Sequence, residues 1–478
     1  MMNRLASFSN LLLILFFLLG LIYLGWRNTT QLLEAKPATL EELRLDDFKN
    51  SVQQFSSAFE TQAGKDAQLL APLAQAKYAV FNNALTRKII PGKEGWLFLW
   101  EETEQIDGMK QVLGKVKLNP IELKQWRVYT NQRSTFLAAQ GIPYYKIIAP
   151  NKASVYPEYL PEGLMPATTN FTDQLLEDLQ QHTEVAWIDL RPILRSYKTR
   201  GQLYYKTDTH WNNLGAFCAA EHILEELTKA GFPVKPLRQA DFNWKTIDKK
   251  GGDAARLMMM PEELRQNYID FEPVGDLSFT NQDSLNQRFA YLSPFITASA
   301  KGELPKTILF HDSFATNLRL FLAYHFQQLY SFWLWGAFDE AVVTQEKPAL
   351  VLDEVVERRL VETQHKNSAN LLNWYWERQF PGLKTLTFDA GKIKSLEDLA
   401  IHFSKMNFPA DQLLIVKLEL ECQKDQKVSF GDAQVMVPYF LTNGRQEIYL
   451  QLDPTQPLLI KENKADLPRL LDVQLKLY

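Results

Sequence analysis

Residues 307–324 read TILFHDSFATNLRLFLAY, and this stretch decides the fold class. Residues 307–310 have the β-branched and apolar side chains of a buried strand, whereas residues 315–324 show the spacing of a helix. Ser313 lies in the short turn between them. In an open α/β sheet such a turn lies at the carboxyl end of the strands, so we expect the Ser313 hydroxyl at that edge.

Short apolar runs alternate with longer helical patterns on both sides of the Ser313 turn. Residues 172–181 and 216–230 are examples of the helical patterns. This alternation predicts an α/β fold, a parallel sheet with helices on both faces. Further strands are expected at residues 96–99, 144–149, 185–190 and 349–352, the last of which runs into a predicted charged helix.

A second stretch that can carry chemistry is YYKTDTHW, residues 204–211. Asp208 and His210 are two residues apart in a predicted loop, because the pair Asn212-Asn213 supplies a good N-cap for the next helix. A carboxylate beside an imidazole fixes its tautomer and stabilises the imidazolium that forms in proton transfer. Either stretch alone is also compatible with a capped loop or a turn serine, but together they favour a site built from Asp208, His210 and Ser313.

An acyl-transfer site also needs hydrogen-bond donors for a developing oxyanion. The backbone N–H of Ser313 is one candidate. Asn151 or Lys152, at the end of the strand predicted over residues 144–149, is a second. A plain turn after Pro150 explains these two residues equally well.

Other polar residues are interpreted as structural. Glu354, Glu357 and Arg358 stand at helical spacing, which favours an ion-pair face. Five histidines lack carboxylate or cysteine neighbours at ligand spacing and are taken as ordinary core or surface residues: His182, His222, His325, His365 and His402.

The first residues of the chain are strongly apolar. Residues 11–26 read LLLILFFLLGLIYLGW, between Arg4 and Arg27. With residues 8–10 the run approaches the roughly 20 residues that span a bilayer as a helix, and no small-x-small cleavage pattern follows it. We expect an uncleaved single-span anchor over residues 1–30.

Cleavage near Gly20 or Gly25 is the alternative to an anchor. A short polar stub before the span favours a cytoplasmic N-terminus, with the bulk of the chain on the outer face of the inner membrane, in the periplasm.

Changes in pattern divide the rest of the chain into three segments. A capping box at Thr39-x-x-Glu42 precedes apolar residues at helical spacing, so residues 31–79 are predicted to form a helical stalk. Residues 80–384 hold the α/β pattern. Residues 385–478 contain strand-like runs separated by turns such as Asn443-Gly444, which predicts a small C-terminal β-sandwich.

Composition excludes some classes of protein. The net charge is −4 and there is no clustered basic excess, so binding to nucleic acid is not indicated. No cofactor is expected. Cys218 and Cys422 are compatible with one disulfide in an oxidising compartment or with two buried thiols, and the second interpretation is preferred.

Several segments resemble the bacterial alginate-type polysaccharide O-acetylation proteins with an SGNH-hydrolase-like domain. The likeness covers about residues 80–360 and keeps the order of that family. The matching segments are GKEGWLF (92–98), PNKASVYPE (150–158), YKTDTHW (205–211), LFHDSF (309–314) and KPALVLDEVVER (347–358).

The resemblance implies an SGNH-hydrolase-like fold with a circularly permuted order, in which Asp and His precede Ser. It implies Ser313 as the nucleophile, His210 as the general base, Asp208 as the orienting acid, and no metal. It further implies transfer of acetyl groups to a polysaccharide hydroxyl through an acyl-serine. The acetyl donor would be a multispanning membrane acyltransferase.

Two positions depart from the family pattern. His311 stands where the family has the glycine before Asp312, and a glycine there permits a tight turn or close approach of a substrate. The His311 imidazole would then either crowd the acyl pocket or supply an extra proton donor. Ala349 replaces an Asp and is expected to be a surface change.

Three alternatives to acetyl transfer stay open. The same triad would serve an acetylesterase, with water as the acceptor. Asp208, His210, His311 and Asp312 are residue types that bind zinc or manganese, so metal-assisted hydrolysis is a second alternative. The third is a scaffold or glycan-binding protein whose site has decayed, which the replacement at His311 suggests.

Overall fold

The computed structural model describes residues 74–478, except 76, 80, 104–105, 362–366, 387–392, 407, 410–411, 432–435 and 462–466. The anchor predicted over residues 1–30 and nearly all of the stalk predicted over residues 31–79 lie outside the described residues. Within the described part, no helix combines the length and apolar character that crossing a bilayer requires.

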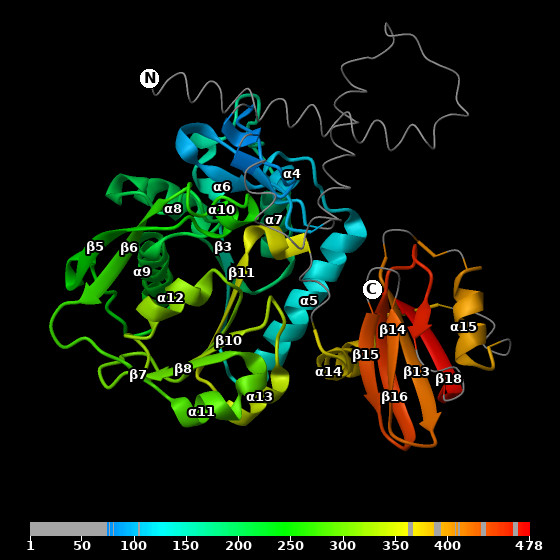
Figure 1. Cartoon of the computed structure of the whole chain (residues 1–478). Coiled ribbons are helices and arrows are strands. Elements are labelled where there is room, and N and C mark those ends of the chain that lie inside the picture. Colours follow the sequence, from blue (N-terminus) through cyan, green and yellow to red (C-terminus); the bar gives the residue numbers. More distant parts are fainter. Residues whose placement is uncertain are drawn as a thin grey trace, which may run out of the picture.

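A seven-stranded sheet forms the centre of the α/β part, in the order β4-β3-β11-β9-β10-β8-β7 (Figure 1). The five strands from β4 to β10 are parallel, β8 runs antiparallel to β10, and β7 runs antiparallel to β8. The strands are β3 (Tyr144–Ala149), β4 (Ala186–Asp189), β7 (Thr280–Asn281), β8 (Pro294–Ala298), β9 (Thr307–His311), β10 (Gln328–Trp333) and β11 (Leu350–Val356).

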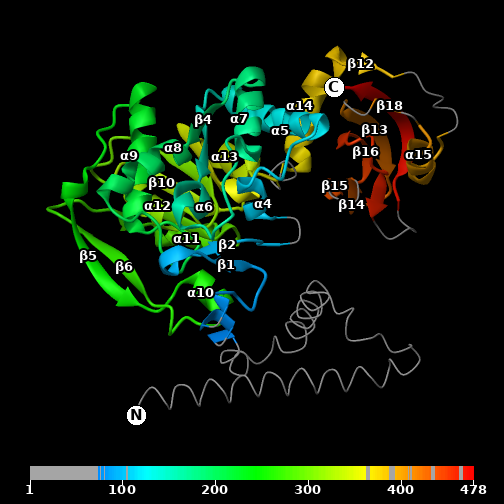
Figure 2. The same ribbon diagram turned by 90° about the horizontal axis from the view of Figure 1, so that it is seen from above.

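Helices cover both faces of this sheet (Figures 1 and 2). Helices α8, α9 and α12 pack on one face, and α5, α7, α13 and α14 pack on the other. The mostly parallel sheet flanked by helices is thereby confirmed, and its central strands are apolar because both of their faces are covered. The helices are α5 (Pro120–Ala138), α7 (Phe171–His182), α8 (Leu190–Ser196), α9 (Asn213–Lys229), α12 (Ala315–Leu322), α13 (Glu340–Glu346) and α14 (Ala369–Gln379).

Asp353 and Glu354 lie in strand β11, so the charged helix predicted after residue 352 is wrong at these positions. Asp353 pairs with Arg133 at 2.5 Å and with Lys146 at 2.8 Å, and these three side chains are at most 1% exposed. Glu354 is fully buried and accepts the Asp312 backbone N–H. The ion-pair partners of Asp353 and the backbone donor to Glu354 come from other segments, which a spacing rule within one segment does not detect. Burial and the charge of Asp312 raise the pKa of Glu354.

Glu357 and Arg358 follow in the short 3-10 helix Glu357–Val361 and are buried. Glu357 lies 3.6 Å from Arg191, and Arg358 pairs with Glu102 at 2.6 Å. Their interpretation as structural ion-pair residues is confirmed, although their partners come from elsewhere in the chain. Ala349 is exposed, as expected.

Two antiparallel hairpins outside the central sheet support the loop that precedes α9. The Leu97 N–H of the first hairpin donates to the Lys206 carbonyl at 2.9 Å, and the Ala255 N–H of α10 donates to the Thr207 carbonyl at 3.0 Å. The first hairpin pairs β1 (Ile89–Pro91) with β2 (Leu97–Leu99). The second pairs β5 (Phe242–Lys249) with β6 (Gln266–Pro273), and α10 (Asp253–Leu257) lies between its strands in the sequence. Three further short helices belong to the α/β part: α4 (Gly108–Val112), α6 (Lys152–Val155) and α11 (Asp283–Arg288).

The C-terminal residues form a four-stranded and a three-stranded antiparallel sheet, in the orders β12-β18-β13-β16 and β15-β14-β17. Side chains of both sheets share one hydrophobic core with α15. Cys218 and Cys422 are buried free thiols, which confirms the interpretation preferred from the sequence. The elements are β12 (Lys384–Thr385), α15 (Leu396–Phe403), β13 (Leu414–Cys422), β14 (Gln426–Gly431), β15 (Met436–Leu441), β16 (Gly444–Leu452), β17 (Leu459–Lys461) and β18 (Arg469–Leu477).

Candidate active site

The turn between β9 and α12 carries Ser313, as the sequence predicts. The buried carboxylate of Asp312 holds this turn: it accepts the Phe314 N–H at 2.9 Å and the Val356 N–H at 2.7 Å. The Asp312 N–H in turn donates to Glu354 at 3.1 Å. The turn is therefore tied to the neighbouring strand β11, which places the Ser313 hydroxyl at the carboxyl edge of the sheet.

The loop before α9 is held at both ends. Asn212 caps α9 by accepting the Gly215 N–H at 2.9 Å, which confirms the predicted capping. The Trp211 indole N–H donates to the Phe314 carbonyl at 3.0 Å and so ties the loop to the nucleophile turn. These bonds bring two segments that are distant in the sequence to the same edge of the sheet.

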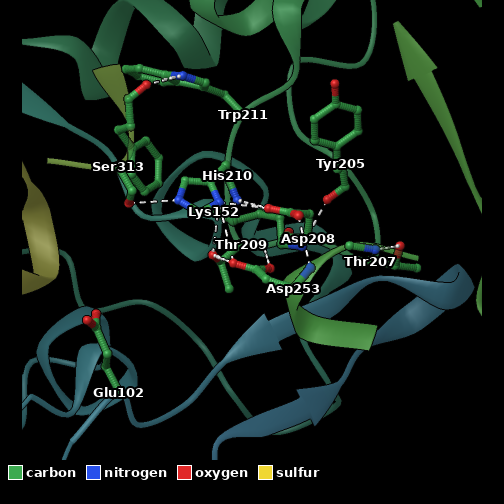
Figure 3. A network of polar contacts seen from close by, with 12 residues as sticks. Glu102, Lys152, Tyr205, Thr207, Asp208, Thr209, His210, Trp211, Asp253 and Ser313 are labelled. Carbon is green, nitrogen blue, oxygen red and sulfur yellow. Dashed lines mark hydrogen bonds and ion pairs between the residues drawn. The ribbon is translucent and has the colours of Figure 1, made fainter. Parts of the chain in front are cut away.

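Asp208, His210 and Ser313 form a continuous chain of hydrogen bonds (Figure 3). The Asp208 Oδ1 lies 2.7 Å from His210 Nδ1, and His210 Nε2 lies 2.8 Å from Ser313 Oγ. A carboxylate only accepts, so Nδ1 carries the proton and Nε2 is left to accept from the serine hydroxyl. This is the arrangement in which an imidazole removes a proton from a nucleophilic serine.

The electrostatic environment favours a charged His210. Burial lowers the pKa of the imidazole, but hydrogen bonds to Asp208 and Asp253 and the charges of both carboxylates outweigh burial. The pKa of His210 is raised from 6.5 to about 9. The site therefore stabilises the imidazolium that forms when the histidine accepts the serine proton.

Asp253 is a polar residue of the site that the sequence interpretation missed. Its Oδ2 lies 3.4 Å from His210 Nδ1, on the same side as Asp208 (Figure 3). Burial raises the pKa of the Asp253 carboxyl, but the hydrogen bonds and charge of His210 and the hydrogen bonds from Thr209 outweigh burial. The pKa of Asp253 is therefore lowered overall. The only local signal was the Gly251-Gly252 pair before it, and no spacing in the sequence links it to His210.

Lys152 is buried, and its ammonium group donates to the carbonyl oxygens of Tyr205, Lys206 and Asp208 at 3.0, 2.9 and 2.7 Å. A lysine has three N–H donors, so these bonds use all of them. Burial lowers the pKa of Lys152 to about 7, against the raising effect of Asp208 and Asp253. The Lys152 side chain therefore anchors the catalytic loop, and only the backbone N–H of Lys152 remains as its expected oxyanion donor.

Asn151 is the other residue expected as an oxyanion donor. Its backbone N–H donates to Glu357 at 2.9 Å, whereas its side-chain Nδ2 is buried and has no hydrogen-bond partner among the described residues. Asn151 lines a small pocket together with Thr209, Arg358 and Phe98. A buried amide without a partner costs free energy unless a ligand or water satisfies it.

His311 is fully buried next to the nucleophile turn. Its Nδ1 lies 2.6 Å from the Asp312 carbonyl oxygen, which can only accept, so the ring proton is on Nδ1. Burial lowers the pKa of His311 to about 3, so the ring is neutral and its single N–H is already used. The His311 N–H is therefore committed to the Asp312 carbonyl, and the two roles expected of this imidazole toward an acyl group stay predictions.

Candidate ligand atoms for a metal ion also lie close together, but in a different set from the one considered above. In the described part of the chain, the carboxylates of Asp208 and Asp253 and the ring of His210 lie within 4.8 Å of one another. His311 and Asp312 do not belong to this group. Both ring nitrogens of His210 already bond to Asp208 and Ser313, which is an arrangement for proton transfer rather than for metal ligation.

Comparison with known proteins confirms the family resemblance. Residues 89–288 match the family described as "SGNH hydrolase-like domain, acetyltransferase AlgX". The chain is 31% identical over 157 residues to the probable alginate O-acetylase AlgJ of Pseudomonas aeruginosa, and 30% identical over 221 residues to that of Pseudomonas syringae pv. tomato. These alignments cover 32% and 41% of this chain, and 36% and 51% of the relatives, so the chain matches between about a third and a half of their length.

Three solved structures align with parts of the chain at low sequence identity. The O-acetyltransferase domain of Pseudomonas putida AlgJ aligns with a TM-score of 0.40 and 20% identity, over 62% of this chain and 98% of that domain. Bacillus cereus PatB1 aligns with a TM-score of 0.42 and 17% identity, over 57% and 96%. Pseudomonas aeruginosa AlgX aligns with a TM-score of 0.38 and 15% identity, over 81% and 90%.

Proposed function

Residues 89–288 match the family of the SGNH hydrolase-like domain of acetyltransferase AlgX, and on this premise we propose that the chain is a polysaccharide O-acetyltransferase. It moves acetyl groups to hydroxyls of an extracytoplasmic, alginate-type polysaccharide through an acetyl-Ser313 intermediate. The observation that carries this proposal is the continuous hydrogen bonding from Asp208 through His210 to Ser313.

The reaction proceeds in two balanced steps. The Ser313 oxygen attacks the donor's acetyl carbonyl while His210 Nε2 takes the hydroxyl proton; the leaving group departs with the proton from the imidazolium. A sugar hydroxyl then attacks acetyl-Ser313, passes its proton to His210, and leaves as the acetyl ester while Ser313 regains a proton. Asp208 stabilises the imidazolium in both steps.

Each step develops a negative charge on the carbonyl oxygen, which needs donors. We assign these donors to the Ser313 backbone N–H and to the Asn151 side chain, because Asn151 lines the same pocket as Thr209 and its buried Nδ2 has no partner among the described residues. An acetyl oxygen would satisfy this amide only when substrate is bound.

The proposal extends to the location of the enzyme. The apolar run of residues 11–26 supports an inner-membrane anchor with the catalytic part in the periplasm. Acetyl groups would then have to be delivered from the cytoplasm, and a multispanning membrane acyltransferase is the proposed donor partner.

Incubation of the full-length protein with p-nitrophenyl acetate and oligosaccharides of alginate type tests this proposal. We expect acetylated oligosaccharide by mass spectrometry, acetylation of Ser313, and labelling of Ser313 by a fluorophosphonate probe. Activity should survive treatment with a chelator. Release of acetate without acetylated sugar would identify an esterase, and a folded protein that binds glycan but resists the probe would identify a decayed scaffold.

Substitution of Gly252 by Ala is expected to lower the rate of acetyl transfer by about 10²-fold. A Cβ at this position would lie 2.2 Å from the Asp208 Oδ2, so Asp208 would have to move, and misplacement of a catalytic group by about 1 Å costs that much. The initial rate with p-nitrophenyl acetate measures the effect. Gly382→Ala is the matched control, because its Cβ would have no atom within 4 Å; equal rates for the two variants would contradict the prediction.

A further inference from the structure

A second carboxylate, that of Asp253, faces the histidine of the triad. Its Oδ2 lies 3.4 Å from His210 Nδ1, the nitrogen that also meets Asp208 at 2.7 Å. Asp253 begins helix α10 and reaches the loop from 44 residues beyond Thr209 in the sequence. The imidazole N–H therefore points to two acidic side chains from different segments of the chain.

The contacts of Asp253 are numerous and join the two segments. Its backbone N–H donates to Asp208 Oδ2 at 2.9 Å. Its carboxylate accepts the Thr209 N–H at 2.6 Å and the Thr209 hydroxyl. Asp208, Thr209 and His210 are thus all in contact with one residue, which limits the movement of the imidazole and of its carboxylate partner.

The residue before Asp253 makes this approach sterically feasible. The Gly252 N–H lies 3.3 Å from the Thr207 hydroxyl oxygen, and a Cβ on Gly252 would fall 2.2 Å from Asp208 Oδ2. Only glycine allows the backbone to come this close to the catalytic loop. The segment before α10 is therefore shaped to bring a carboxylate to His210.

The charged groups around His210 lie at different distances from its imidazole ring. Asp208 and Asp253 are in direct contact with the ring, and their side chains are 16% and 28% exposed, so solvent screens them only in part. The Lys152 ammonium is hydrogen-bonded to the Asp208 carbonyl. The Arg358 guanidinium lies 5.4 Å from the centre of the Phe314 ring, and the centre of that ring lies 4.8 Å from the centre of the His210 ring. Contact with two carboxylates thus dominates the electrostatics of the ring.

We propose that Asp253 is a positioning residue of this active site: its charge joins that of Asp208 in stabilising the imidazolium form of His210, and its bonds to Thr209 hold the loop. The proposal rests on the proposed function only for the role of His210 as general base. It has a consequence for pH. Only the neutral form of His210 can accept the serine proton. The activity of the free enzyme should therefore rise with pH through the raised pKa of His210, near 9.

Titration of His210 in Asp253→Asn measures this effect without depending on activity. NMR of the full-length chain with isotope-labelled histidine gives the midpoint, and His210→Gln identifies the signal. We expect the midpoint to fall by about one pH unit or more, the usual effect of losing an opposite charge at contact distance. The acid limb of kcat/KM for p-nitrophenyl acetate should move to lower pH by the same amount, and the plateau should fall about tenfold.

Two further variants separate charge from structure. Thr209→Val removes the hydroxyl bond to Asp253 but keeps its charge, so the His210 midpoint should stay close to that of the wild type while the rate falls. Asp248→Asn removes an acidic side chain from strand β5 that is 60% exposed and paired with Arg265, so neither the midpoint nor the rate should change.

An unchanged His210 midpoint in folded Asp253→Asn would overturn the proposal. If that variant does not fold, Asp253→Ser is measured in its place under the same criterion. A lowered midpoint in a protein that transfers no acetyl group would support the role of Asp253 toward His210 and reject the proposed function, so the two failures are distinguishable.

Discussion

Ser313→Ala is expected to lower kcat for acetyl transfer by about 10⁴-fold or more. The variant lacks the oxygen that attacks the acetyl carbonyl, and His210 Nε2 loses the hydroxyl that lies 2.8 Å away. The residual rate would come from the oxyanion donors and substrate binding alone. Because Asp208, His210 and Ser313 act as one unit, substitution of Ser313 together with His210 should cost little more than Ser313→Ala alone.

Initial rates with p-nitrophenyl acetate and an oligosaccharide acceptor measure this effect, together with labelling by a fluorophosphonate probe. Ser196→Ala is a suitable control, because Ser196 is exposed and its hydroxyl donates only to the Ile193 carbonyl of its own helix. A Ser313→Ala protein that keeps more than a tenth of the wild-type rate would rule out the acyl-serine route.

Asp353→Ala is expected to lower the free energy of unfolding by about 3–5 kcal/mol. The Asp353 carboxylate meets Arg133, Lys146 and the Tyr144 hydroxyl, and it is completely buried. Burial raises the pKa of Asp353, but the charges of Lys146 and Arg133 outweigh burial and keep the carboxyl ionised.

Removal of Asp353 leaves two buried cations without their anion. Burial already lowers the pKa of Lys146 to about 8, so this group can release its proton. Arg133 cannot do so, and it retains the cost of an uncompensated buried charge.

Urea denaturation, followed by tryptophan fluorescence and circular dichroism, measures the loss. The matched control is Glu272→Ala, which removes an acid that is 61% exposed and paired with Lys245 on the surface. Surface pairs contribute about 1 kcal/mol or less, so this control should unfold almost as the wild type does. A similar loss for both variants would contradict the role assigned to the buried cluster.

The sequence by itself determined the features that depend on neighbouring residues. The strand, turn and helix around Ser313 could be predicted because apolar periodicity and turn composition act within about ten residues. The pair Asp208 and His210 could be recognised for the same reason, since the carboxylate and the imidazole that it orients are two residues apart. The order of these elements, in agreement with a family pattern, then predicted that Ser313 and His210 would meet.

The tertiary structure alone decided which charges are buried and which segments meet. Glu354, Glu357 and Arg358 have the spacing of a charged helix face, yet Asp353 and Glu354 lie in a buried strand. Arg133 and Lys146 compensate the charge of Asp353 from other segments, and the Asp312 backbone N–H donates to Glu354. The Lys152 side chain holds the catalytic loop, and Asp253 reaches His210 from beyond the following hairpin strand. Electrostatic interactions act over distances in space, not along the chain, so partners such as these become visible only when the fold brings them into contact.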